Sequence, residues 1–461
     1  MATRKEVDPL GERLIPRDAY FGIQTLRATE NFPVSGIKAP AAFVDAYVLV
    51  KKAAAAANMQ LGCLNEKTAK AIIAACDEVL SGKLRDQFVV DVFQAGAGTS
   101  FNMNVNEVLA NRALEILGKK KGDYKTVNPN DHVNMAQSTN DTFPTALHIS
   151  VLMSLQPLLA ALDGLADAFI GLGKKYAHVL KSGRTHLQDA VPVTVGQEFT
   201  AYGSAVANAC IELRKRQENL YAVALGGTAV GTGANAHPKY KQLAIAELAR
   251  MTGFPLKSAA DNFEALQSMR AAQSVSSGLK ELALELIRIA NDLRLLASGP
   301  TTGLNEIVLP PVQPGSSIMP GKVNPVMAEC LDMVAFQVIG CDAAVSLAVQ
   351  AGQMELNVMT PIIMYNMLFS AQILSNFIPV FTEKCVRGIT VNEAQCSQYL
   401  EKNPSLATLL SPYIGYLEAA KIAKQAQAEN RSVKEIALEK KLLKPEEIER
   451  IFSRKNLLNE Q

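Results

Sequence analysis

The chain has 461 residues, of which 48% are hydrophobic and 20% are charged. That length exceeds what one hydrophobic core supports and predicts about three domains or one very elongated one. The 46 basic and 44 acidic residues give a net charge of +2 without any long basic block, so nucleic acid is not an expected partner. Aromatic residues make up only 6% and tryptophan is absent, which favours an alanine-rich helical protein over a sandwich or barrel.

The charged fraction lies below the roughly 25% that is typical of soluble domains. A helical protein with so little charge hides more surface than one chain covers, so we expect an oligomer. Residues 1–10 alternate in charge and lack the apolar core of a signal peptide. Because no 18-residue apolar stretch occurs outside alanine-rich amphipathic segments, we expect a soluble, cytoplasmic protein with no membrane partner.

Cysteine and histidine patterns bear on metals and disulfides. The seven cysteines are scattered and include no CxxC pair, which predicts free, mostly buried thiols in a reducing compartment. The five histidines lack the spacing of metal ligands, so no metal site is expected. His148 and His178 lie on helical stretches and are expected to be structural, whereas His186 lies in a polar loop and is a candidate functional residue.

Three domains are predicted in chain order. Residues 1–141 combine helices, among them 51–61 and 66–80, with loops rich in glycine and asparagine. Residues 142–390 contain long apolar-periodic segments separated by short Gly/Pro loops, which predicts a central five-helix bundle. Residues 391–461 form a small C-terminal helical domain with amphipathic pieces. The fold class is therefore mainly α.

The bundle helices are expected near 143–170, 195–225, 262–298, 326–350 and 361–380. The clearest of them carries a heptad-like seam of Val275, Leu279, Leu282, Leu286, Ile289, Leu293 and Leu296. Gly299 and Pro300 stop this helix. Leu284, Ile287 and Leu295 add a second apolar stripe, so the helix is expected to pack on more than one side.

Four polar loops carry the candidate chemistry: 96–100, 137–141, 183–189 and 315–325. Each alone is compatible with ordinary turn chemistry. The last loop is the most informative, because glycines and prolines frame a tandem serine and a lysine, as in a lid over an active site. A fifth segment, 224–233, is rich in glycine but lacks the ending of a Walker A loop, and no dinucleotide fingerprint is present.

Five motifs together carry a family resemblance: GAGTS at 96–100, QSTND at 137–141, GRTHLQDA at 183–190, LGGTAVGTG at 225–233 and GSSIMPGKVNP at 315–325. In this order they resemble the aspartase/fumarase superfamily, and the likeness extends to the opening PRDAYFG. The resemblance implies a three-domain, mainly α-helical subunit. It also implies a homotetramer with a twenty-helix core and active sites assembled from three subunits.

Within the superfamily, the residues in and around these motifs resemble the aspartase branch, whose members deaminate L-aspartate reversibly to fumarate and ammonia. Ser-Thr-Asn at 138–140, the stretch 128–134 and Val-Met-Ala-Glu at 326–329 resemble that branch. His186 is shared with class II fumarases, so hydration of fumarate to L-malate is the alternative. A catalytically silent helical oligomer is a further alternative, which the presence of the lid and donor residues disfavours.

The resemblance also implies roles for single residues. Ser316 is the expected general base, activated by loop N–H groups and by Lys322, in a reaction that passes through an aci-carboxylate dianion. His186 is expected to pair with Glu329. The alternative for Glu329 is an ordinary acidic residue at a helix N-terminus.

The expected partner is a small dicarboxylate substrate. Donors for its carboxylates are Thr99, Thr185, His186, Lys322 and Asn324. Acceptors for its ammonium group are Ser138, Thr139 and Asn140. No organic cofactor is expected, because the substrate carboxylate serves as its own electron sink.

Overall fold

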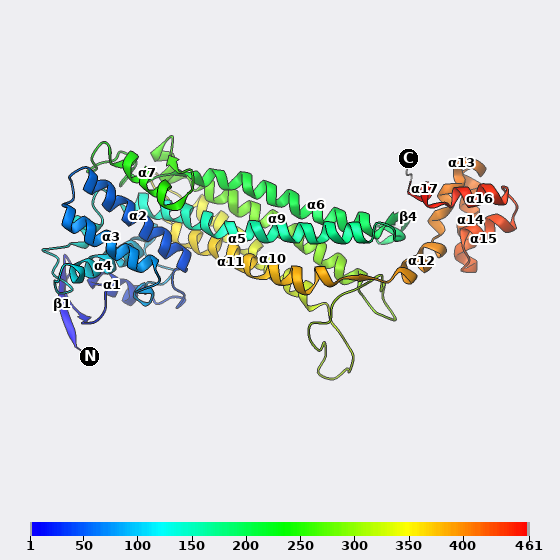
Figure 1. Ribbon diagram of the computed structural model, residues 1–461, viewed down its shortest axis with the longest axis horizontal. Helices are drawn as coiled ribbons and strands as arrows, with labels where there is room; N and C mark the ends of the chain where they lie inside the picture. Colours follow the sequence, from blue (N-terminus) through cyan, green and yellow to red (C-terminus); the bar gives the residue numbers. More distant parts are fainter. Residues whose placement is uncertain (1, 459–461) are drawn as a thin grey trace. The chain divides into compact units, whose positions relative to one another are not determined.

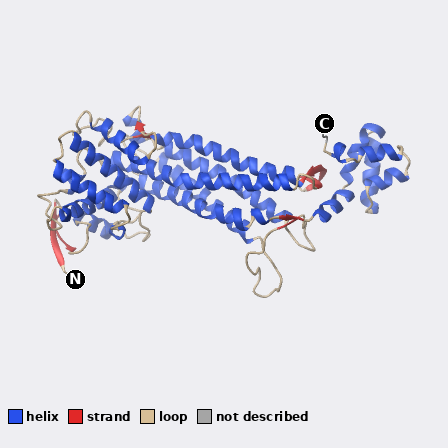
Figure 2. Cartoon of the chain, viewed as in Figure 1, coloured by secondary structure: helices blue, strands red, loops and turns tan. Residues whose placement is uncertain are grey.

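The computed structural model describes residues 2–458. Helices dominate, and the strands among these residues form only two-stranded pairs (Figure 2). The mainly α fold class is therefore confirmed. Two of these pairs consist of two-residue strands. They are β5 (Ala222–Val223) with β6 (Lys257–Ser258), and β7 (Ile307–Val308) with β8 (Thr390–Val391).

Contacts within the chain group into two compact units. Unit 1 comprises Met1–Leu159, Ile211–Ala283 and Phe336–Ser375, and unit 2 comprises Ala160–Cys210, Leu284–Ala335 and Asn376–Gln461. Each unit draws on three separate segments of the chain. The three sequence-based domains follow chain order instead, and their boundaries at 141 and 390 stay a prediction.

Unit 1 begins with an antiparallel hairpin and four helices. These are β1 (Thr3–Asp8), β2 (Gly11–Pro16), α1 (Ile23–Asn31), α2 (Ala41–Gln60), α3 (Glu66–Leu80) and α4 (Thr99–Ile116). The Asn65 side chain caps α3 by accepting the Thr68 N–H, so the helix predicted over 66–80 is confirmed. The alanine-rich helix α2 packs against α3 and against α7 (Tyr240–Thr252), and α4 packs against α1 and α3 (Figure 1).

Five long helices follow the predicted pattern. They are α5 (Thr139–Lys175), α6 (Val195–Gln217), α9 (Arg270–Leu296), α10 (Val326–Gln350) and α11 (Thr360–Lys384). Each contributes one part to unit 1 and another to unit 2. The longest has 37 residues and is therefore about 55 Å long.

The segment 262–298 was expected to be one helix, and this expectation is wrong at its start. It contains α8 (Asn262–Gln267) and α9, separated by Ser268 and Met269, and the backbone of Ser268 is extended. The Ser268 hydroxyl accepts the N–H of Arg270 at 3.4 Å, so the side chain competes with the helical hydrogen bond and starts a new helix. The seam from Val275 to Leu296 is buried as predicted.

Two long helices expose apolar faces within one chain. On α10, Met333, Phe336 and Leu347 are 62%, 56% and 64% exposed, and on α9, Leu284 and Leu295 of the second stripe are exposed as well. By length and composition, α5, α10 and α11 are long and apolar enough to span a membrane. The spacing of the α10 residues places them on one face, which requires an apolar neighbour.

The C-terminal residues of unit 2 form short helices around their own core. They are α12 (Glu393–Lys402), η6 (Pro404–Leu410), α13 (Ser411–Ile414), α14 (Tyr416–Glu429), α15 (Val433–Glu439), α16 (Pro445–Ile451) and α17 (Arg454–Leu457). A capping box between Ser432 and Glu435 starts α15. A separate C-terminal domain over 391–461 stays a prediction, since these helices belong to unit 2 together with earlier segments. All seven cysteines are free, and of these Cys63 is exposed.

Candidate active site

Unit 1 contains a polar hollow of about 480 Å³ that collects predicted site residues from two loops. Thr99, Ser138, Thr139 and Asn140 line it together with Gln24, Asn102, Met103, Asn130, Asn134, Ala136, Gln137, Thr228, Ala229, Ala234 and Asn235. Every polar side chain in this lining is a hydroxyl or a carboxamide, and none is charged. Such a surface offers directional hydrogen bonds to a small polar ligand.

Thr99 is the first residue of α4 and follows the single turn η2 (Gly96–Gly98). Gly98 has a φ of +84°, and a Cβ atom there would lie 2.1 Å from the Phe143 ring. Glycine is required on both counts, since any side chain is strained in this conformation and would displace the ring. The close contact fixes the start of α4 against α5.

Asp141 anchors the start of α5. Its carboxylate accepts N–H groups from Ser138 at 2.9 Å, Gly226 at 3.0 Å and Thr228 at 2.9 Å. Burial raises the pKa of Asp141 to about 6, and these N–H groups oppose the shift. The Asn140 amide donates to Ala229 O at 2.7 Å. The glycine-rich segment 224–233 thus forms one wall of the hollow.

Several carboxamides of this lining were not predicted from the sequence. Asn102 donates to Thr139 Oγ1 at 3.0 Å, and Asn134 accepts from Asn102 and Asn106 at 3.2 Å each. Asparagine is a poor residue for a helix interior, yet α4 contains Asn102, Asn104, Asn106 and Asn111, all buried. That run is a sequence signal for a buried polar network.

In unit 2, Thr185 and His186 lie at the exposed tip of a hairpin instead of in an irregular loop. The hairpin consists of β3 (Leu180–Thr185) and β4 (Gln188–Thr194). His186 and Leu187 both have positive φ, 55° and 60°, as a type I′ turn requires. Neither is a glycine or asparagine, so the turn stores strain of about 1 kcal/mol per residue. The loop expected over 183–189 is wrong in this respect, because the pairing continues to the turn.

A buried ion cluster fixes the base of this hairpin. Glu306 is fully buried and accepts two hydrogen bonds from Arg184, at 2.9 and 3.0 Å. It also forms an ion pair with Lys181 at 2.7 Å. Glu198 also pairs with Lys181 at 2.9 Å. Arg184 immediately precedes Thr185, and Glu306 precedes the loop with Ser316. The cluster therefore connects the two segments of unit 2 that contain predicted site residues.

The loop 309–325 has a closed neck and a donor-rich tip. Gly315 N donates to Lys322 O at 2.9 Å, and the Asn324 amide donates to Gly315 O. A Cβ atom on Gly315 would lie 2.3 Å from Lys322 O, which explains the glycine. The Ser316 hydroxyl accepts N–H groups from Ile318 at 3.2 Å and Met319 at 3.0 Å. Two N–H donors aimed at this oxygen suit a serine that acts as an oxyanion.

Glu329 lies in the first turn of α10, where an acidic residue is favoured by the helix dipole. Within residues 2–458 of one chain, no ion pair joins it to His186. Their predicted pairing stays a prediction. Of the predicted residues, Thr185, His186, Ser316, Lys322, Asn324 and Glu329 belong to unit 2, and the remaining ones belong to unit 1.

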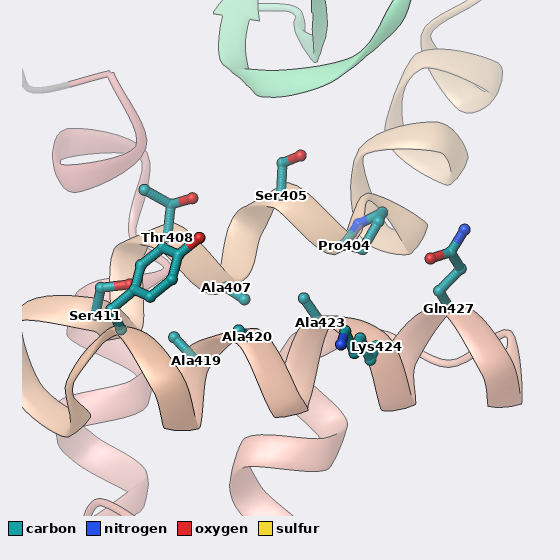
Figure 3. A pocket seen from close by; sticks show the side chains of 11 residues that line it. Pro404, Ser405, Ala407, Thr408, Ser411, Ala419, Ala420, Ala423, Lys424 and Gln427 are labelled. Atoms are coloured by element: carbon teal, nitrogen blue, oxygen red, sulfur yellow. The ribbon is translucent and has the colours of Figure 1, made fainter.

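A second hollow, of about 350 Å³, lies between η6 and α14 (Figure 3). Its lining is mostly small, with Ala407, Ala419, Ala420 and Ala423, and it contains none of the predicted site residues. Over the described part of the chain, no group of three or more His, Cys, Asp or Glu side chains is placed to hold a metal ion.

Comparisons with known proteins agree over nearly the whole chain. Residues 11–340 match the family described as Lyase, and residues 406–459 match the family described as Fumarase C C-terminus. An aspartate ammonia-lyase from Bacillus subtilis is 50% identical over 450 residues, 98% of this chain and 95% of that protein. One from Pseudomonas aeruginosa is 51% identical over 445 residues, 96% and 94% of the two chains.

Solved structures give the same fold. A fumarate lyase:delta crystallin from Brucella melitensis, bound to cobalt, is 50% identical with a TM-score of 0.95 and 98% coverage of both chains. A class II fumarase from Schistosoma mansoni is 36% identical with a TM-score of 0.96 and complete coverage of both.

The ion cluster of Glu306 predicts a large loss of stability on substitution. Glu306→Gln leaves Arg184 without its carboxylate partner and leaves Lys181 with Glu198 alone, so the free energy of unfolding should fall by about 3 kcal/mol. Glu281→Gln is the control, because Glu281 pairs with Arg216 at an exposed position and should cost less than about 1 kcal/mol. Thermal unfolding followed by circular dichroism measures both. Equal midpoints for the two variants would refute the anchoring role of Glu306.

Proposed function

Because the chain belongs to the aspartase/fumarase superfamily, we propose that it is a lyase that deaminates L-aspartate reversibly to fumarate and ammonia. The observation that carries the proposal is the uncharged hollow of unit 1, in which Ser138, Thr139 and Asn140 converge with Thr99. About 50% identity to proteins named aspartate ammonia-lyase, over almost their full length, supports this substrate. Identity to the Schistosoma fumarase is lower, at 36%.

The chemistry requires removal of a proton from the carbon next to the β-carboxylate. That carboxylate is already negative, so the intermediate is a dianion and needs preorganised donors. We assign the proton transfer to Ser316. Its hydroxyl oxygen accepts two loop N–H groups, which stabilise the serine as an oxyanion before it takes the proton.

The substrate groups are distributed over the two sets of residues. Thr99 and the other hydroxyls and amides of the hollow hydrogen-bond to one end of the substrate. Thr185, His186, Lys322 and Asn324 supply donors for the remaining charge, and His186 is assigned to a pair with Glu329 that keeps its ring oriented. Elimination of ammonia then needs no organic cofactor, because the carboxylate accepts the electron pair.

We further propose that the working protein is a homotetramer in the cytoplasm, with each active site built from several subunits. The apolar faces of α9 and α10 need a cover that one chain does not provide. In unit 1 an apolar hollow of about 590 Å³, lined by Phe32, Val34, Phe93, Val358 and Met359 among others, is a further uncovered surface. Subunit contacts account for all three surfaces without placing α5, α10 or α11 in a membrane.

The substrate distinguishes the two enzymatic proposals. Fumarate absorbs in the ultraviolet, so its formation from L-aspartate and from L-malate can be compared directly. We expect kcat/KM for L-aspartate to exceed that for L-malate by at least about a hundredfold, because the site must place an ammonium group where malate has a hydroxyl. A preference for L-malate would establish the fumarase alternative, and no turnover of either substrate would favour a silent oligomer.

The general base is tested by Ser316→Ala. Turnover of L-aspartate should fall at least about a thousandfold, since the variant lacks the oxygen that is proposed to accept the proton. Ser317→Ala is the matched control, because it removes the neighbouring hydroxyl from the same exposed loop and should leave most of the activity. Size-exclusion chromatography checks that both variants keep the same assembly. More than a tenth of the wild-type rate in Ser316→Ala would exclude Ser316 as the base.

Shared sites predict complementation between inactive variants. Ser316→Ala and Asn140→Ala should each be inactive as pure proteins, whereas mixed tetramers from coexpression contain sites with both native side chains. Random mixing of equal amounts should restore about a quarter of the wild-type activity. The rate of fumarate formation by purified mixed tetramers measures this recovery. Mixed tetramers as inactive as their parents would show that both residues come from one chain.

A further inference from the structure

Lys51 is the cation beneath the hollow of unit 1. It lies on α2, its side chain is fully buried, and its Nζ donates to Asn102 Oδ1 at 2.7 Å, Asn134 Oδ1 at 3.0 Å and Gln137 Oε1 at 3.0 Å. The three N–H bonds of an ammonium group are therefore all used by neutral carboxamides. Among the described residues, no carboxylate lies within ion-pair distance of this Nζ. Placing an unpaired charge here is costly, which requires a compensating use.

The ammonium group determines which way the Asn102 amide points. Because Asn102 Oδ1 faces Lys51, its Nδ2 faces Thr139 Oγ1 at 3.0 Å. A hydroxyl that accepts from an amide keeps its own proton free for another acceptor. Thr139 lines the hollow, so that proton is available to a ligand. Without the Lys51 ammonium group, the Asn102 carboxamide can flip so that its oxygen accepts the Thr139 hydroxyl proton. That proton is then no longer available to a ligand.

We propose that Lys51 is a positioning residue: through Asn102 it holds Thr139 as a hydrogen-bond donor toward a carboxylate of the bound dicarboxylate. This inference rests on the proposed function and changes one assignment within it. Thr139 then donates to a carboxylate of the substrate, instead of accepting from the substrate's ammonium group. Lys51 itself does not line the hollow and touches no substrate. Its positive charge, screened by only one layer of amides, additionally favours an anion above it.

The protonation state of Lys51 gives this arrangement a pH dependence. Burial lowers the pKa of Lys51 to about 7, and the nearby Asp141 of α5 and Cys76 of α3 oppose the shift. The Tyr47 ring on the same helix lies 5.5 Å from Nζ and also faces it. The ammonium form is present below this pKa and is lost as the pH rises through it. An anionic ligand stabilises the ammonium form, so the loss should appear in kcat/KM and much less in kcat.

The test compares Lys51→Met with Lys52→Met. Both substitutions remove one lysine from α2, but Lys52 pairs with Asp77 outside the hollow. In Lys51→Met, KM for L-aspartate should rise at least about tenfold, the loss expected for one charge-assisted interaction. The fall of kcat/KM above pH 7 should disappear. Lys52→Met should keep the wild-type KM and pH profile, and the same values in Lys51→Met would overturn the proposal.

A second variant decides the matter if Lys51→Met does not fold. Asn102→Asp keeps the size of the side chain and gives Lys51 a carboxylate partner, yet its oxygens accept the Thr139 proton. We expect the same rise in KM, with the fall of kcat/KM moved to higher pH because the new carboxylate stabilises the ammonium group. An unchanged KM would overturn the proposal.

Binding separates this inference from the proposed function. Calorimetric titration of wild type, Lys51→Met and Lys52→Met with fumarate measures affinity without turnover. If the wild type binds fumarate but does not deaminate L-aspartate, the proposed function fails while the affinity ratio still tests Lys51. A tenfold weaker affinity confined to Lys51→Met supports the inference, and equal affinities for the two variants contradict it.

Discussion

The carboxylate of Asp141 is the interaction on which the site of unit 1 depends. It is fully buried at the start of α5, and it accepts N–H groups from the residue before the helix and from the glycine-rich segment. Hydrogen bonds to an ionised group are stronger than neutral ones, so this one side chain holds two distant segments in register. Ser138, Thr139 and Asn140 then project from a fixed helix end toward Thr99, itself fixed by the close approach of Gly98 to Phe143.

In unit 2 the predicted site residues lie mainly on a hairpin tip and an exposed loop, and not at a fixed helix end as in unit 1. Such segments lack a core of their own and would move freely without an anchor. The Glu306 cluster provides one at the base, and the glycine neck of loop 309–325 provides another. Both tips remain exposed, and the hairpin tip is also strained at His186 and Leu187. A lid needs this division, with a rigid frame and a cover that can close on a ligand.

The sequence predicted most of the helical framework, because apolar periodicity reports which faces are buried. It predicted the bounds of α3 and the buried seam of α9, but it joined α8 to α9, since one serine side chain decides that break. The hairpin tip at His186 was unpredictable from composition, because neither turn residue is a glycine. Motif residues identified the four loops, whereas Lys51 and Asn102 were missed, since a lysine within an alanine-rich helix looks like a surface residue.

The chain has few charged residues, and three of them are fully buried beside the predicted site segments. Burial of a charge costs free energy that a hydrophobic residue of the same size would not, so buried charges are retained where they specify one arrangement. Here Lys51, Asp141 and Glu306 are each fully buried, and each lies directly beneath a segment that contains predicted site residues. The hollow above Lys51 and Asp141 is itself uncharged. Fixed charge is thus used to orient neutral donors, and the neutral donors are left to meet a substrate whose own charge grows during the reaction.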